Sequence, residues 1–136
     1  MTGTSRTDVS GLTVRWSDAD AARFRAEGHW QDSTLVDTAR AALAADPGKT
    51  LLIEGARHLT RREAWDQALH LAGFFRARRL VPGDVISLQL PNWIEAAIIA
   101  LAARMMGLII NPIPPIYRDS EVGYILANCR AKLVFV

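Results

Sequence analysis

The chain has 136 residues, of which 50% are hydrophobic and 22% are charged, and its formal net charge is +2; this length and composition fit one globular domain with a hydrophobic core. Its basic residues are scattered instead of forming a stripe, which predicts no nucleic-acid partner. Residues 1–30 contain no apolar signal segment, and the single Cys129 cannot form an internal disulfide, so we expect a cytoplasmic protein.

Residues 1–15 are rich in Thr, Ser and Gly and poor in apolar side chains. Such a segment buries too little surface to offset its ordering entropy, so we expect a mobile tail. A short helix should follow, capped by Ser17 or Asp18 and ending before Gly28. A second, amphipathic helix is predicted over residues 34–45.

A hairpin and the longest helix come next in the sequence. Two short strands, residues 50–53 and 57–59, flank a turn and predict a tight antiparallel hairpin. Thr60 and Glu63 stand three residues apart, the spacing of a capping box. They predict the start of a long amphipathic helix over residues 61–79.

Residues 85–90 predict the first strand of a parallel unit. Apolar side chains alternate there with Ser87 and Gln89, which indicates one buried face and one mixed face. The following helix is expected to be capped by Asn92, with Glu95 completing a capping box. A proline separates this cap from the strand.

The helix over residues 96–103 is small or apolar on every side, which is typical of a buried helix. Arg104 and Gly107 interrupt the apolar run before it is long enough to cross a bilayer, so we expect no membrane span. Gly107 fits the left-handed position after a helix, and residues 108–110 form a short apolar strand. A strand, a helix and a strand at this spacing predict a right-handed parallel β-α-β unit.

A second unit of the same kind ends the sequence. A helix capped by Asp119 or Ser120 should run to about Asn128, and residues 132–136 should form the next strand. The fold class is therefore α/β, with sequential β-α-β units preceded by a β-hairpin and helices. Because no turn follows the last apolar strand, we expect a domain truncated at its C-terminal end.

The usual phosphate-loop, dinucleotide, nucleophile-elbow and zinc-protease motifs are all absent from the sequence. We therefore assign no catalytic, cofactor-binding or metal-ligating residue. His70 and His58 are expected on a polar helix face and a partly exposed strand, and Cys129 is expected to be a small buried hydrophobe. Two further groups are expected to be structural: the packing or capping aromatics His29, Trp30, Trp65 and Trp93, and the solvated arginines Arg61, Arg62, Arg76, Arg78 and Arg79.

Several short motifs together resemble the N-terminal part of the AMP-forming acyl-CoA synthetases, which belong to the adenylate-forming superfamily. The residues that carry the resemblance are Pro82, Gly83 and Asp84, then Leu90, Pro91, Asn92 and Glu95, then Gly107, Asn111 and Pro112. It implies that residues 16–136 are the N-terminal portion of an AMP-binding adenylation domain. Each motif alone is common, and their order and spacing make the resemblance specific.

The resemblance implies an ATP-dependent acid–CoA ligase, active in fatty acid metabolism, that forms an acyl-AMP and transfers the acyl group to coenzyme A. ATP, Mg²⁺ and coenzyme A would serve the full-length parent, together with a small carboxylic acid as substrate. The family's pyrophosphate loop, ribose-binding aspartate and C-terminal lysine all lie beyond residue 136. We therefore expect this fragment alone to bind no cofactor and to be inactive.

The segment Phe24–Leu35 is similar to the opening of aryl-acid and cyclohexanecarboxylate-type CoA ligases. This similarity favours an alicyclic, aryl or medium-chain acid over a long-chain fatty acid.

Two other functions also fit the pattern of elements. Half of a nucleotide-binding oxidoreductase would show consecutive β-α-β units, although no glycine follows Leu90 at the turn. A non-catalytic interaction module would use the strand edge at residues 132–136 to bind a partner. In a ligase, the remainder of the same polypeptide would cover that edge.

Overall fold

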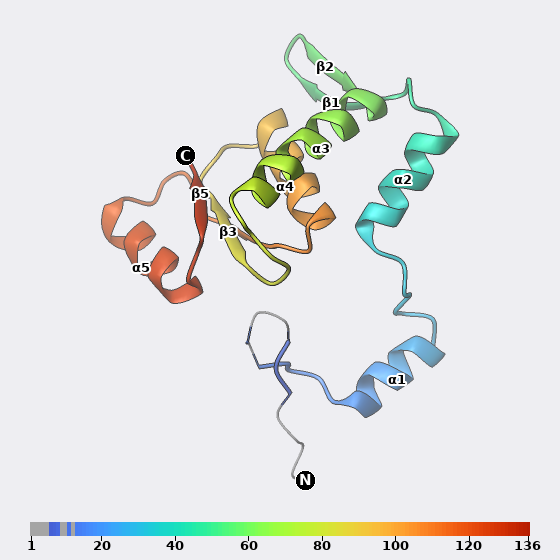
Figure 1. Ribbon diagram of the computed structural model, residues 1–136. Coiled ribbons are helices and arrows are strands. Elements are labelled where there is room, and N and C mark those ends of the chain that lie inside the picture. The colour runs from blue at the N-terminus through green and yellow to red at the C-terminus, as the bar shows by residue number, and fades with distance from the viewer. Residues whose placement is uncertain (1–5, 9–10, 12) are drawn as a thin grey trace.

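The computed structural model describes residues 6–8, 11 and 13–136, and it has the expected α/β architecture (Figure 1). Expectations for the tail at residues 1–15 fall partly outside this range. The helices are α1 (Asp18–Ala26), α2 (Leu35–Ala45), α3 (Arg61–Ala77), α4 (Ile94–Met105) and α5 (Asp119–Cys129). The strands are β1 (Thr50–Glu54), β2 (Arg57–Thr60), β3 (Val85–Leu88), β4 (Ile109–Pro112) and β5 (Leu133–Phe135).

Local capping explains where the first three helices begin. The side chains of Ser17, Thr34 and Thr60 each accept a hydrogen bond from the backbone N–H of the third residue of the helix. The acidic side chain of that third residue in turn accepts a hydrogen bond from the backbone N–H of the cap residue. These reciprocal bonds satisfy amides that would otherwise lack a partner. The expected capping box of Thr60 and Glu63 is confirmed.

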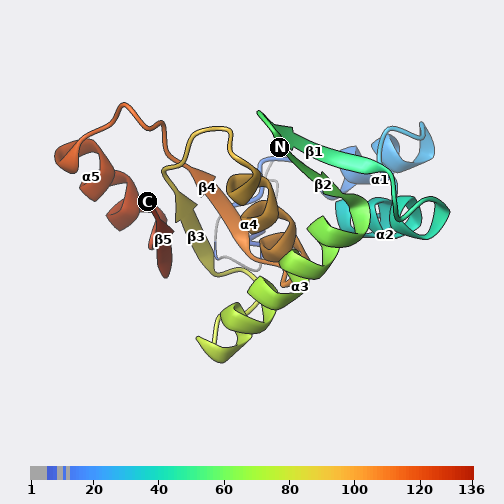
Figure 2. The ribbon, with the colours of Figure 1, turned by 90° about the horizontal axis from the view of Figure 1, so that it is seen from above.

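The strands form two separate sheets. β1 and β2 make the predicted antiparallel hairpin, while the second sheet is parallel with the order β4-β3-β5. The first strand of the parallel sheet therefore lies at its centre, and β5 returns past β3 to the edge opposite β4. Both views show this sheet between α5 on one side and α3 with α4 on the other (Figures 1 and 2).

β3 is buried along its whole length, which corrects the expectation of a mixed face. Ser87 has no exposed surface, and its Oγ lies 3.8 Å from Cys129 Sγ at the end of α5. The Asn111 side-chain amide donates to Ser87 Oγ at 3.0 Å. This bond satisfies a hydroxyl that would be costly to bury alone.

α4 packs against α3 and the sheet to form most of the core. The sequence predicts a helix that is buried on every side, but α4 is only partly buried. Ile98, Ile99, Ala102 and Ala103 are buried, but the other residues between 96 and 103 are only half-buried. The observed stripe shows that the helix has one core face and one face that is partly open to solvent.

The expected cap of α4 is wrong. Its N-cap residue is Trp93 instead of Asn92, and no side chain of its own segment caps it. At the other end, Gly107 takes the expected left-handed conformation with φ of 66°, and a Cβ there would lie 3.2 Å from Pro82 Cβ. In the described part of the chain, no helix is both long and apolar enough to cross a membrane.

Candidate functional site

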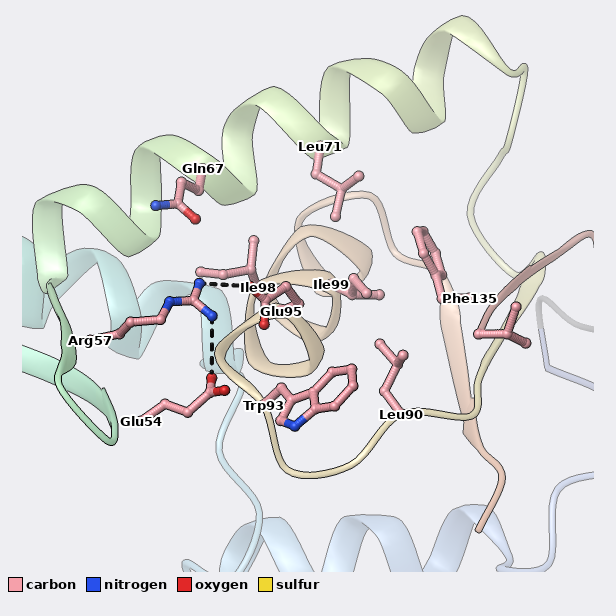
Figure 3. Close-up of a pocket in the computed structure, with 11 residues that line it drawn as sticks. Glu54, Arg57, Gln67, Leu71, Leu90, Trp93, Glu95, Ile98, Ile99 and Phe135 are labelled. Atoms are coloured by element: carbon pink, nitrogen blue, oxygen red, sulfur yellow. Dashed lines mark hydrogen bonds and ion pairs between the residues drawn. The ribbon is translucent and has the colours of Figure 1, made fainter. Parts of the chain in front are cut away.

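A cavity of about 640 Å³ opens where β3 and β5 end (Figure 3). The hairpin, α3, the start of α4 and the end of the sheet contribute its walls. The lining residues are Glu54, Arg57, Gln67, Leu71, Leu90, Trp93, Glu95, Ile98, Ile99, Phe135 and Val136. The carboxyl ends of strands are the usual place for ligands in open parallel sheets, so this cavity is the candidate site.

The interior of the cavity is apolar. Ile98 and Ile99 of α4 form buried walls, and Leu71, Leu90 and Phe135 are half-buried around them. Figure 3 shows these side chains and the Trp93 indole around a common space. The described wall side chains other than Trp93 and Gln67 carry no hydrogen-bonding group, so the interior of the cavity offers mainly apolar contact.

The rim of the cavity carries an ion-pair network. Arg57 Nη2 donates to Glu95 Oε1 at 2.6 Å, and Arg57 Nη1 lies 3.6 Å from Glu54 Oε2. The hydrogen bond from Arg57 lowers the pKa of the Glu95 carboxyl below its ordinary value and raises the pKa of Arg57 itself. Arg57 is the only cation among the described lining residues, and both its neighbours are carboxylates.

Glu54 also supplies the cap that α4 lacks. Its Oε2 accepts the Ile94 backbone N–H at 2.8 Å, although the two residues are 40 positions apart. The carboxylate thus meets the positive end of the helix dipole. Glu54 and Arg57 are not expected at a site from the sequence; opposite charges flanking a two-residue turn could have indicated their pairing, but nothing local indicates the contact with α4.

The rim does not fit a metal ion or a nucleotide phosphate. Within the described residues there is no group of three His, Cys, Asp or Glu side chains placed to hold a metal. The two rim carboxylates already share Arg57, so among the described lining residues there is no unpaired cation to bind a phosphate. We therefore assign no step of catalysis to these residues.

The histidines and the cysteine lie outside the cavity. His58 and His70 are exposed, as expected. Cys129 is half-buried instead of fully buried. Its Sγ accepts a hydrogen bond from Asn111 Nδ2 at 3.4 Å, which joins the end of α5 to β4.

Not all of the residues expected to be structural behave as expected. Arg61 is half-buried, not solvated, because its Nη1 donates to the carbonyl oxygens of Ala42 at 2.7 Å and Asp46 at 3.2 Å. It thereby binds the C-terminal end of α2. Trp30 packs against two nearby aromatic rings, with its ring centroid 5.5 Å from Trp16 and 5.2 Å from Phe24.

A family model described as "AMP-binding enzyme" matches residues 39–136. The chain belongs to this family. The match covers the hairpin, α3, the parallel sheet and every residue that lines the cavity. Among the three functions considered from sequence, it favours the AMP-binding enzyme over the oxidoreductase and the interaction module.

Curated relatives of this chain include CoA ligases. The chain is 30% identical over 125 residues to the medium-chain fatty-acid–CoA ligase of Escherichia coli (strain K12), covering 91% of this chain and 22% of that protein. It is 28% identical over 123 residues to the 2-hydroxy-7-methoxy-5-methyl-1-naphthoate–CoA ligase of Streptomyces carzinostaticus, covering 90% and 22%. The chain thus spans about a fifth of the length of these relatives.

A solved structure has the same fold as this chain. The N-terminal subdomain of Klebsiella oxytoca NpsA, in complex with 3-hydroxyanthranilyl-AMSN, aligns with a TM-score of 0.69 at 23% identity. The alignment covers 74% of this chain and 26% of that one. The expected α/β fold of an adenylate-forming N-terminal region is therefore confirmed.

Proposed function

We propose that the chain is the N-terminal part of an ATP-dependent acid–CoA ligase. Residues 16–136 would be the first portion of its adenylation domain. The observation that carries the proposal is the family match over residues 39–136, joined to 30% identity with a fatty-acid–CoA ligase across most of the chain. The parent would act in the cytoplasm, and a further segment of it would pair with the free edge of β5.

The proposed reaction joins a carboxylate to ATP, forms an acyl adenylate and releases pyrophosphate, and then transfers the acyl group to the thiol of coenzyme A. Activation is needed because a free carboxylate is a poor acyl donor, whereas adenylate is a good leaving group. Mg²⁺ would neutralise phosphate charge as it develops. The residues of this chain support the domain that binds these groups and supply none of the phosphate ligands.

Pyrophosphate exchange tests whether the full-length parent forms an acyl adenylate and whether the 136-residue chain alone supplies any catalytic group. The full-length parent should exchange labelled pyrophosphate into ATP only when its acid is present, while the 136-residue chain alone should show no exchange. Acid-dependent exchange by the chain alone would contradict the claim that its residues supply no catalytic group. Absence of exchange by the parent with every acid tried would contradict the ligase assignment.

The acid is proposed to carry a ring or a medium-length chain. Support comes from the relatives, whose names specify a medium-chain fatty acid and a substituted naphthoate, and from the segment Phe24–Leu35. Formation of CoA esters by the parent should be compared for cyclohexanecarboxylate, benzoate, octanoate and palmitate. A preference for palmitate would contradict this part of the proposal.

A further inference from the structure

We propose that a second cavity, at the amino ends of the parallel strands, binds a phosphate group that takes no part in the proposed reaction. The phosphate is either free or carried by a small organic molecule. This amino-end cavity encloses about 490 Å³, a volume typical of small-molecule sites. Its lining includes Val85 and Ile109, the first residues of β3 and β4. It therefore lies at the opposite end of β3 from the candidate cavity, which is lined by Leu90.

Two cations give the amino-end cavity an excess of positive charge. Arg130 ends α5 and Lys132 directly precedes β5, and both line the cavity. Among the residues that the structure describes, neither side chain has an ion-pair or hydrogen-bond partner. Asp84 is the one carboxylate of the described lining, and its Oδ2 accepts the Val81 backbone N–H at 2.9 Å. Unlike Arg57 in the candidate cavity, these cations are therefore available to an anion.

The cations and a neighbouring amide match the acceptors of a phosphate. A guanidinium donates two parallel N–H bonds to phosphate oxygens, and an ammonium adds a point charge. Asn128 also lines the cavity, and its side-chain amide has no partner within the described part of the chain. The adjoining wall is fixed, because Asn111 Nδ2 donates to Ser87 Oγ at 3.0 Å and to Cys129 Sγ at 3.4 Å.

Arg130 stands at a backbone position where glycine is usual. Its φ of 54° and ψ of 43° are left-handed, and its N–H donates to the Ala127 carbonyl at 3.3 Å while Ala131 N–H donates to Leu126 at 3.1 Å. A side chain strains this helix ending, which glycine adopts freely. Arg79 has a similar φ of 61° but does not line the cavity. The conformation alone thus assigns no role to Arg130; its place beside a second cation at a cavity does.

The test measures how fast the thiol of Cys129 is alkylated in the 136-residue chain. Cys129 is the single cysteine of the chain and lines the amino-end cavity, so a bound ligand should shield it. Inorganic phosphate should slow alkylation by iodoacetamide, a neutral reagent, whereas potassium chloride of equal ionic strength should not. Equal rates in phosphate and chloride would overturn the proposal, because simple screening acts equally in both.

Ribose 5-phosphate, as a second probe, distinguishes the two sources of the phosphate group. Protection of Cys129 at a lower concentration than inorganic phosphate requires would support an organic phosphate as the ligand. Protection at the same concentration would support free phosphate. Neither probe needs an acid or ATP, so the amino-end cavity can be tested even if the parent activates no acid.

Replacing Arg130 by glycine should move stability and binding in opposite directions. Arg130→Gly should raise the melting temperature by about 1–4 °C, since the strain of the left-handed side chain is removed. It should also raise the phosphate concentration needed for protection by about tenfold or more, as expected for the loss of a charge-assisted hydrogen bond. A variant that melts higher but keeps its protection would show that Arg130 does not bind phosphate, and would overturn the proposal.

Arg79→Gly is the matched control, because it removes an arginine from the same backbone conformation outside the cavity. It should raise the melting temperature to a similar extent and leave protection by phosphate unchanged. Lys132→Gln should weaken protection without changing the left-handed helix ending. Equal loss of protection in the Arg79 and Arg130 variants would mean that only the net charge of the chain matters, and would also overturn the proposal.

Discussion

Glu54 caps a helix that begins 40 residues later, because its Oε2 accepts the Ile94 N–H at 2.8 Å. Removal of this acceptor by Glu54→Ala should lower the free energy of unfolding by about 0.5–2 kcal/mol, the usual cost of a lost N-cap. Glu54→Gln retains an acceptor oxygen and should cost less. Urea denaturation measures both, and amide exchange at Ile94 should accelerate in the alanine variant. Unaltered exchange there would show that Glu54 does not cap α4 in solution.

The pair of Arg57 and Glu95 should make stability depend on pH. Because Arg57 lowers the pKa of Glu95 below 4.5, the pair stabilises the fold above that pH and loses this contribution as the pH falls through the lowered pKa. The difference in melting temperature between the native chain and Glu95→Gln should therefore be largest near neutral pH and shrink in acid. It should also shrink in high salt, since both side chains are exposed. A difference independent of pH would refute the assignment.

Ile98 should be intolerant of charge. It is 7% exposed on the core face of α4, so Ile98→Asp would bury a carboxylate without a partner and should cost more than about 3 kcal/mol. Leu69→Asp, at a half-exposed position of α3, should change stability by only about 0.5 kcal/mol. Chemical denaturation of the two variants gives the comparison. Equal effects would mean that Ile98 is not buried in solution.

Substitution by alanine should change the stability of the chain in opposite directions at two glycines. Gly107 has φ of 66°, and a Cβ would come within 3.2 Å of Pro82, so Gly107→Ala should destabilise the chain by about 1–2 kcal/mol. Gly73 lies inside α3, and apart from its chain neighbours and the local helix backbone no atom lies within 4 Å of the added Cβ. Gly73→Ala should stabilise the chain by about 0.5–1 kcal/mol. Thermal melts that moved in the same direction for both variants would contradict these assignments.

Contacts within one segment could be predicted from the sequence. Thr60 and Glu63 were expected to form a capping box, and they do, because both partners lie in the same turn of chain. The left-handed Gly107 follows in the same way from its position after an apolar helix. Such features depend on few neighbours, so the rest of the fold leaves them unchanged.

The cap of α4 shows why other features could not be predicted. Asn92 and Glu95 have the spacing of a capping box, but Arg57 engages the Glu95 carboxylate and Glu54 takes the free amide of Ile94. A distant hairpin thus replaces the local motif. The cavity rim could not be predicted for the same reason, because it forms only where the hairpin contacts the start of α4.

The central place of β3 in the order β4-β3-β5 has a consequence for folding during synthesis. β3 leaves the ribosome before either neighbouring strand, and the partner for its second edge is complete only at Phe135. At about 5–20 residues per second, several seconds separate the synthesis of Leu88 from that of Phe135. During that interval the nascent chain carries a strand that is buried throughout in the folded protein but still lacks a native neighbour, and this is the period in which a ribosome-associated chaperone would have most to protect.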